Sequence, residues 1–193
     1  GKRLGRATAL ALADAGYDII VHFGRSAAEA DAVVAAVQSR GRQAVAIGAD
    51  LADTDAPAAL IAQASDGRAL TALVNCASIF EHDDIADFSE THFARHMRIN
   101  AFAPTALAQA FARSLPQDAR GVVVNFLDFK LQQPYGDHLS YTLSKYALAG
   151  ATEVASPATR QAGGLSATRR PRQAPTPPLP TAPPPSNHLC CPR

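Results

Sequence analysis

A phenol and an amine stand four residues apart in the stretch 128–145, at Tyr141 and Lys145. On a helix this spacing puts both side chains on one face, within reach of one site. A tyrosine ordinarily titrates at about 10, so one that exchanges protons near neutral pH needs a positive neighbour that lowers its pKa. The pair is therefore a candidate general acid with its supporting cation, although a packed tyrosine beside a solvated lysine has the same spacing.

The composition of the 193-residue chain excludes several classes of function. Its hydrophobic content of 47% is ordinary for a globular α/β protein, and its net charge of +1 indicates neither a nucleic-acid partner nor a membrane surface. No apolar run approaches the length of a membrane span and no signal-peptide pattern is present, so a cytoplasmic location is expected. His92 and His96 have helical spacing but lack a third ligand, and the three cysteines lack metal spacing. We expect no metal site.

Charge and proline divide the chain unevenly. The last acidic residue is Glu153, and ten of the fourteen prolines lie between Pro157 and Pro192. We therefore predict two parts, an incomplete NADP-binding Rossmann-like domain over residues 1–154 and a disordered Pro/Arg-rich tail over 155–193. The tail has two interpretations. One is the translation of a coding region in a shifted frame, and the other is a Pro-rich linker or ligand segment.

Short apolar strands alternate with helical runs along the first part. This order predicts a doubly wound parallel sheet of the α/β class. No strand precedes the first helix, and the proline-rich tail is not expected to supply a sixth strand. The predicted strands cover 17–22, 43–48, 70–75 and 122–126, and the helical runs cover 7–15, 27–40, 56–64, 101–115 and 141–154.

Two of the turns in this pattern have residues suited to binding phosphate. Gly5 lies just before the first helix, where a glycine turn presents backbone N–H groups and a positive helix end to a pyrophosphate. Arg25 follows the strand 17–22, where an acid favours NAD and an arginine favours the 2′-phosphate of NADP. A solvated arginine at a helix start is the alternative for Arg25.

Two other strand ends carry candidate substrate contacts. Phe80 follows the strand 70–75 and is a candidate for stacking on a flat substrate, although a loop phenylalanine more often packs against its own protein. Asp128 comes almost directly after the strand 122–126. Open parallel sheets bind ligands at the carboxyl ends of their strands, so both positions face the expected site.

With Gly5, Asn75, Asn100, Tyr141 and Lys145 in this order, residues 1–154 resemble the short-chain dehydrogenase/reductase family. The family's first strand would lie before residue 1, and its last strands have no counterpart after residue 154.

More narrowly, the chain is similar to the pteridine-reductase branch. There an arginine, here Arg3, replaces the middle glycine of the phosphate turn. An aspartate, here Asp128, replaces the serine that the family usually has thirteen residues before the tyrosine. Cys76 departs from the pattern, because asparagine is usual there.

The resemblance implies a reductase that binds NADP(H) and passes hydride to a C=N or C=O carbon of a small-molecule substrate, with pterins or dihydrofolate ahead of simple ketones. It implies that Lys145 holds the nicotinamide ribose and lowers the Tyr141 pKa, and that Asn100 organises water. Proton delivery would come from Tyr141, Asp128 or water, and we expect Asp128 to be protonated or hydrogen-bonded during turnover. The implied catalytic residues are Asn100, Asp128, Tyr141 and Lys145, and the substrate residues are Phe80 and Asp128. The implied cofactor residues are Arg3, Leu4, Gly5, His22, Arg25, Ser26, Asp50, Leu51, Asn75, Ala77, Ser78, Tyr141 and Lys145.

Two other functional classes stay open at this point. The chain can be an inactive, truncated or frameshifted relative that keeps part of a cofactor site, or a scaffold whose Pro-rich tail binds partners. The resemblance also implies a homodimer or homotetramer formed through the helices at 101–115 and 141–154.

Overall fold

The computed structural model describes residues 3–161 and 165–167, and the side chains of residues 4–155. Helices and parallel strands alternate along the chain. The helices are α1 (Arg3–Asp14), α2 (Ala27–Gln38), α3 (Ala56–Ser65), α4 (Glu90–Met97), α5 (Ala103–Ser114) and α6 (Leu139–Gln161), with a π-helix η1 (Arg98–Phe102) and a 3-10 turn η2 (Phe129–Leu131). The strands are β1 (Ile19–Phe23), β2 (Ala44–Gly48), β3 (Ala72–Asn75), β4 (Gly121–Asn125) and β5 (Leu165–Ala167).

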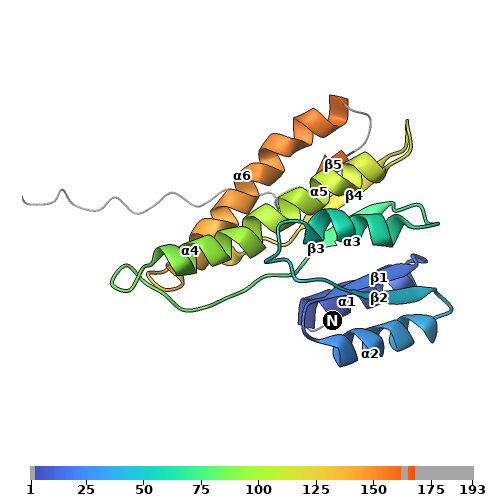
Figure 1. The fold of residues 1–193 in the computed structure, drawn as a ribbon, viewed down its shortest axis with the longest axis horizontal. Coiled ribbons are helices and arrows are strands. Elements are labelled where there is room, and N and C mark those ends of the chain that lie inside the picture. Colours follow the sequence, from blue (N-terminus) through green and yellow to red (C-terminus); the bar gives the residue numbers. More distant parts are fainter. Residues whose placement is uncertain (1–2, 162–164, 168–193) are drawn as a thin grey trace, which may run out of the picture.

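The strands form two parallel sheets, with the orders β1-β2 and β3-β4-β5. Ile19 lies opposite Ala44 in the first sheet, and Ala72 lies opposite Val122 in the second. In Figure 1 the first sheet lies with α1 and α2, and the second lies with α3, α5 and α6. This is the Rossmann-like α/β fold that the alternation of elements predicts.

Buried apolar side chains form two clusters. In one, Val33 and Val37 of α2 are fully buried against β1 and β2. The other is centred on Phe111 of α5, which packs with α3 and with Val123 of β4, and it extends to Ile47 of β2. The second cluster therefore joins the two sheets.

The C-terminal end of the described chain differs from the prediction. The last helix was expected to end at Val154, but α6 continues to Gln161. Strand β5, which follows, pairs in parallel with β4 in a segment predicted to lack secondary structure. The Pro- and Arg-rich composition after residue 154 was taken to end the regular structure, yet α6 includes Pro157. The rest of the predicted tail, residues 168–193, lies outside the described residues.

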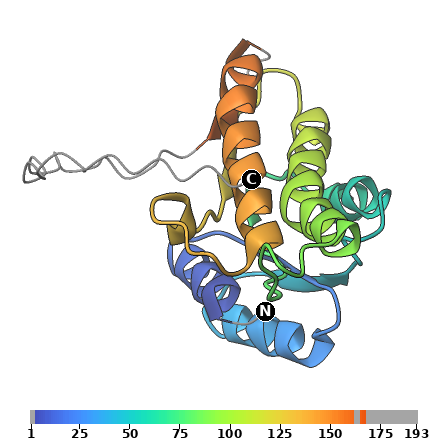
Figure 2. The same cartoon turned by 90° about the vertical axis from the view of Figure 1, so that its left-hand side faces the viewer.

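The segment between β3 and β4 is helical but not uniformly so. The π-helix η1 separates α4 from α5 and contains Asn100, just before the helix predicted over 101–115. Such π-turns are rare and often occur at functional sites. Figure 2 shows α5 and α6 side by side above α1 and α2. No helix among the described residues is long and apolar enough to cross a membrane.

Candidate active site

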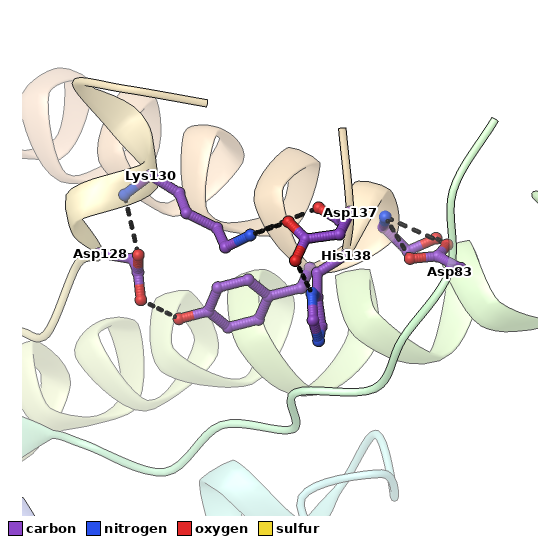
Figure 3. Close-up of polar contacts among 7 residues, drawn as sticks. Asp83, Asp128, Lys130, Asp137 and His138 are labelled. Carbon is purple, nitrogen blue, oxygen red and sulfur yellow. Dashed lines mark hydrogen bonds and ion pairs between the residues drawn. The ribbon is translucent and has the colours of Figure 1, made fainter. Parts of the chain in front are cut away.

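The site is built at the carboxyl end of β4 and the first turns of α6. Asp128 follows β4, and its Oδ1 accepts a hydrogen bond of 2.8 Å from the backbone N–H of Lys130 in η2. Its Oδ2 accepts a hydrogen bond of 2.6 Å from the hydroxyl of Tyr141, as Figure 3 shows. Tyr141 is only 5% exposed. The turn after β4 therefore holds a carboxylate directly against the buried phenol.

This contact sets the protonation states of both groups. Burial raises the pKa of Tyr141, and the hydrogen bond to Asp128 and the charge of Asp128 raise it further. Burial also acts to raise the pKa of Asp128, but hydrogen bonds from Lys130 and Tyr141 and the charges of Lys145 and Lys130 outweigh it, so that the pKa lies below its ordinary value. At neutral pH the pair is a neutral phenol that donates to an ionised carboxylate. The state of Asp128 during turnover stays a prediction.

Lys145 lies one turn after Tyr141 on the same helix. Its Nζ is 5.7 Å from the centroid of the Tyr141 ring and donates a hydrogen bond of 2.9 Å to the carbonyl of Phe126. The side chain is 4% exposed, and burial lowers its pKa although the charge of Asp128 opposes this. Among the described residues, the bond to Phe126 uses one of the three donors of the ammonium. The expected lowering of the Tyr141 pKa by Lys145 is wrong for this structure, because burial and Asp128 dominate.

Asn100 is buried and holds two parts of the site together. Its amide N–H group donates to the carbonyl of Ile79 at 3.0 Å and to the hydroxyl of Ser144 at 3.0 Å. Its side-chain oxygen accepts from the N–H of Ile79 at 2.9 Å. The structure thus places Asn100 between the loop after β3 and the helix that carries Lys145. Its role in a water path stays a prediction.

Phe80 presents an aromatic surface beside Tyr141. It is 55% exposed, and its ring meets the Tyr141 ring edge-on at a centroid distance of 4.6 Å. The imidazole of His138 stacks on Phe80 at 3.9 Å between ring centroids, with 8° between the planes. His138 is absent from the sequence prediction, and its only sequence signal is its position three residues before Tyr141.

A charged group borders the same aromatic surface. Lys130 pairs with the carboxylate of Asp137, and Nδ1 of His138 lies 3.1 Å from the other carboxylate oxygen (Figure 3). The hydrogen bond from Lys130 is the main reason that the pKa of Asp137 is lowered. Lys130 Nζ also lies 6.0 Å from the centroid of the Phe80 ring. The sequence prediction did not include Lys130 or Asp137.

The end of β1 has the features expected of a phosphate site. Arg25 is exposed, and no ion pair or hydrogen bond engages its side chain within the part of the chain that the structure describes. Ser26 is the N-cap of α2, yet its hydroxyl makes no capping bond. A free guanidinium and a free hydroxyl at a helix N-terminus fit a phosphate group.

Other predicted cofactor residues near this sheet are already engaged within the protein. His22 Nε2 donates to the carbonyl of Ala49 at 2.9 Å, and burial lowers the pKa of its imidazole despite this bond. Asp50 accepts a hydrogen bond of 3.0 Å from the N–H of Ala52. The side chain of Leu51 is buried in the core, so only its backbone can face a ligand.

The remaining predicted cofactor residues lie at the end of β3 and the start of α1. Asn75 is buried and donates to the side-chain oxygen of Asn125, at the end of β4, at 2.8 Å. Ala77 and Ser78 follow it and are exposed. A Cβ placed on Gly5 would lie 3.9 Å from Sγ of Cys76, so the start of α1 adjoins the end of β3. Leu4 is exposed, and the side chain of Arg3 lies outside the described residues.

The structure therefore divides the predicted residues into two groups. Phe80, Asp128, Tyr141 and Lys145 come together around one buried phenol, with Asn100 behind them. Of the phosphate candidates, Arg25 and Ser26 follow β1 of the other sheet, whereas Gly5 lies near the start of α1, beside the end of β3. Among the described side chains, no group of three or more His, Cys, Asp or Glu residues could hold a metal ion.

Comparison with known proteins matches the first 163 residues to one family. The family model described as short chain dehydrogenase covers residues 1–163. The 2-dehydro-3-deoxy-D-gluconate 5-dehydrogenase of Dickeya dadantii is 31% identical over 78% of this chain and 59% of its own length. Pteridine reductase 1 of Leishmania tarentolae is 30% identical over 80% of this chain and 67% of its own length.

A similar solved structure is the FolM alternative dihydrofolate reductase 1 from Brucella suis in complex with NADP. It has a TM-score of 0.76 and 32% identity, and the match covers 83% of this chain and 67% of that one. The chain spans about half to two thirds of the length of the curated relatives that it matches.

Proposed function

The chain belongs to the short chain dehydrogenase family, and we propose that it is an NADPH-dependent reductase. Its substrate is a small molecule with a flat ring, pterin-like or dihydrofolate-like, that is reduced at a C=N or C=O bond. The observation that carries the proposal is the 2.6 Å hydrogen bond from the Tyr141 hydroxyl to Asp128, with Lys145 one helical turn away. At neutral pH this buried phenol is protonated and so holds a proton to give, but its raised pKa makes it a weaker acid than an ordinary tyrosine.

Two residues at the end of β1 favour NADPH over NADH as the cofactor. Arg25 supplies an exposed, unengaged guanidinium, and Ser26 supplies a free hydroxyl at the start of α2. These two groups would hold the 2′-phosphate, and the ammonium of Lys145 would hold the nicotinamide ribose. The Brucella suis protein, which shares this fold, is in complex with NADP.

The choice of a flat substrate rests on Phe80 and Asp128. Phe80 is half exposed beside Tyr141 and already carries one stacked nitrogen heterocycle, the imidazole of His138. An aromatic face of this kind binds flat rings by stacking. Asp128 offers a carboxylate to ring N–H groups next to it. Two similar proteins, named pteridine reductase and alternative dihydrofolate reductase, support the same class of substrate.

Residues of this chain would donate the proton to the substrate and stabilise the charge that this leaves behind. NADPH, when bound, supplies the hydride that adds to the substrate carbon and leaves as NADP⁺. Tyr141 gives its hydroxyl proton to the nitrogen or oxygen of the reduced bond, and the phenolate that remains is balanced by the ammonium of Lys145. Asp128 holds the phenol in place beforehand, but its charge opposes the phenolate. Water must then return a proton to Tyr141.

The test is consumption of NADPH by the full chain with 7,8-dihydrobiopterin as substrate, followed by NADPH absorbance. We expect turnover by the wild type and a loss of about a hundredfold or more in Tyr141→Phe, which removes the donor. Phe80→Ala should raise the KM for dihydrobiopterin and leave the KM for NADPH unchanged. Tyr146→Phe is the matched control, because the Tyr146 hydroxyl is exposed and donates to the carbonyl of Leu131.

The outcomes separate the proposal from its alternative. Turnover that survives Tyr141→Phe contradicts the role of the phenol. An unchanged rate and an unchanged pH profile in Asp128→Asn would refute any relay of protons through Asp128. A second candidate is an inactive relative that retains a cofactor site. It predicts thermal stabilisation by NADPH without any turnover.

We also infer a cytoplasmic homodimer or homotetramer, formed through α5 and α6. The π-helix just before α5 exposes Phe102, and α6 exposes Leu143 and Tyr146. Covering such residues favours association of subunits. Light scattering on the purified chain should give a mass of two or four protomers, and a monomer would contradict this part of the proposal.

A further inference from the structure

A carboxylate with no exposed surface lies in the loop between β3 and α4. Asp83 is 0% exposed. Its Oδ1 and Oδ2 accept the backbone N–H of Ser140 at 3.0 and 3.2 Å, and its Oδ2 also accepts the hydroxyl of Ser140 (Figure 3). The backbone carbonyl of Asp83 accepts the N–H of Leu139 at 3.0 Å. A buried carboxylate is tolerated only when its oxygens are well bonded, so this contact is a fixed feature of the fold.

These bonds fix the beginning of the helix that carries the candidate acid. The first N–H groups of any helix lack partners within the helix, and a negative charge there is favoured by the helix dipole. Leu139 and Ser140 begin α6, and the N–H groups of both are bonded by Asp83. Asp83 thus caps α6 from a loop that lies 57 residues earlier in the sequence.

The same loop is held firmly on its other side, around Phe80. Asn100 bonds both the N–H and the carbonyl of Ile79, at 2.9 and 3.0 Å. Nε2 of the fully buried His96 accepts the N–H of Glu81 at 3.3 Å. Phe80 stands between these two anchored residues. Its backbone is therefore tied to α4 and η1 by these bonds, and to α6 by Asp83.

The bonds from Asp83 to α6 also fix the position of His138, the residue just before the helix. His138 has a φ of 53°, in the left-handed region that costs energy for residues with a Cβ. Its ring nevertheless stacks on Phe80, and its carbonyl accepts the N–H of Thr142 at 2.9 Å. Because Leu139 is fixed by Asp83, the chain direction at His138 is fixed as well.

We propose that Asp83 is a positioning residue that sets the distance and orientation between Phe80 and Tyr141. It does so by bonding the first turn of α6 to the loop that carries the aromatic surface. A flat substrate stacked on Phe80 then lies where the Tyr141 hydroxyl can reach it. The geometric part of the inference stands on the contacts of Asp83 alone, whereas its effect on turnover rests on the proposed function.

The geometric part is tested by NMR of the full chain with labelled aromatic rings. Stacking on Phe80 should move the ring signals of His138 upfield, and Asp83→Ala should remove that displacement. Asp83→Asn keeps one acceptor oxygen and should therefore retain part of the upfield displacement of the His138 signals. Ser140→Ala, which removes only the hydroxyl bond, should give a small change in the same direction. It also provides a readout if Asp83→Ala does not fold.

Two controls separate positioning from a general loss of stability. Asp87→Asn changes an exposed carboxylate of the same loop, which bonds the N–H of Asp84 at 2.7 Å and does not contact α6. Ser89→Ala removes the N-cap of α4, whose side chain accepts the N–H of His92. Both should leave the His138 signals in place, even where Ser89→Ala lowers the melting temperature as much as Asp83→Asn.

Kinetics test the functional part on the same variants. In Asp83→Asn we expect kcat with dihydrobiopterin to fall by about tenfold to a hundredfold, since small misplacements of reacting groups cost that much. The KM for NADPH should change by less than about twofold, because the hydrogen bonds of Asp83 are with Leu139 and Ser140, which are not predicted cofactor residues. His138 signals that are unchanged in Asp83→Ala overturn the inference. A wild type that shows those signals but never turns over refutes the proposed function and leaves the geometric inference standing.

Discussion

Replacing Asp128 by asparagine should lower the pKa of Tyr141. The amide has nearly the same shape as the carboxylate but no charge, so it can keep a hydrogen bond and lose the repulsion of a phenolate. The hydroxyl oxygen lies 2.6 Å from Oδ2 of Asp128. This places the two centres of charge roughly 4 Å apart, and at that separation Coulomb's law gives about 4 kcal/mol at an effective dielectric constant near 20 and about 1 kcal/mol in water.

These energies correspond to a fall of about one to three pH units in the Tyr141 pKa, at about 1.4 kcal/mol per unit. Asp128 is only partly buried, so solvent screens its charge and we expect the lower half of that range. The substitution lowers the pKa of Tyr141 at either dielectric constant. Burial, the first cause of the raised pKa, is unchanged by the substitution, and the pKa should therefore remain above its ordinary value.

Near-ultraviolet absorbance of tyrosinate measures the effect during rapid jumps to alkaline pH. The chain has four tyrosines, so the signal of Tyr141 is isolated by subtracting the same titration of matched variants that carry Tyr141→Phe. Asp137→Asn is the control, because that carboxylate pairs with Lys130 and is not a cause of the raised pKa of Tyr141. Tyr141 that titrates identically in wild type and Asp128→Asn would refute the electrostatic description of the site.

Three further predictions concern the cofactor, acid stability and packing. Arg25→Glu should reverse the preference for NADPH over NADH in fluorescence titrations, and an unchanged preference would exclude Arg25 from the phosphate site. The lowered pKa of Asp128 contributes stability that is present above about pH 4 and is lost as the pH falls through the folded-state value, so Asp128→Asn should unfold with a weaker pH dependence in acid. Gly121→Ala should destabilise the chain by about 1–3 kcal/mol in denaturant titrations, because its Cβ would lie 2.7 Å from ring atoms of Phe111. Gly150→Ala, in α6 with no atom within 4 Å of the new Cβ, should be neutral or stabilising.

The order of elements and the placement of Tyr141 and Lys145 on one helix were predictable because each depends on residues close together in the sequence. Alternating apolar runs reveal strands and helices within a few residues of sequence, and the Tyr141 to Lys145 spacing is itself one helical turn. Strand β5 was missed for a related reason. The composition around Pro157 argued against regular structure, whereas pairing of Leu165 with Gly121 of β4 decides the outcome in space.

The features that the sequence did not reveal depend on contacts between distant segments. Asp83 looks like one acid among several in a polar loop, and only the fold brings it to Ser140. The stacking of His138 on Phe80 likewise joins residues far apart in sequence. An ionised Asp128 was expected to raise the Tyr141 pKa against Lys145, but the sequence does not show the burial of the phenol, which is the main cause of the raised pKa.

The central claim is that this chain moves hydride from NADPH to a flat substrate beside Tyr141. It is tested most directly by mass spectrometry of dihydrobiopterin after a single turnover with NADPH deuterated at the reactive nicotinamide carbon. We predict that deuterium enters the reduced pterin with the wild-type chain and that Tyr141→Phe slows its appearance by about a hundredfold or more. NADPH that binds to the folded chain without any transfer of deuterium would contradict the claim.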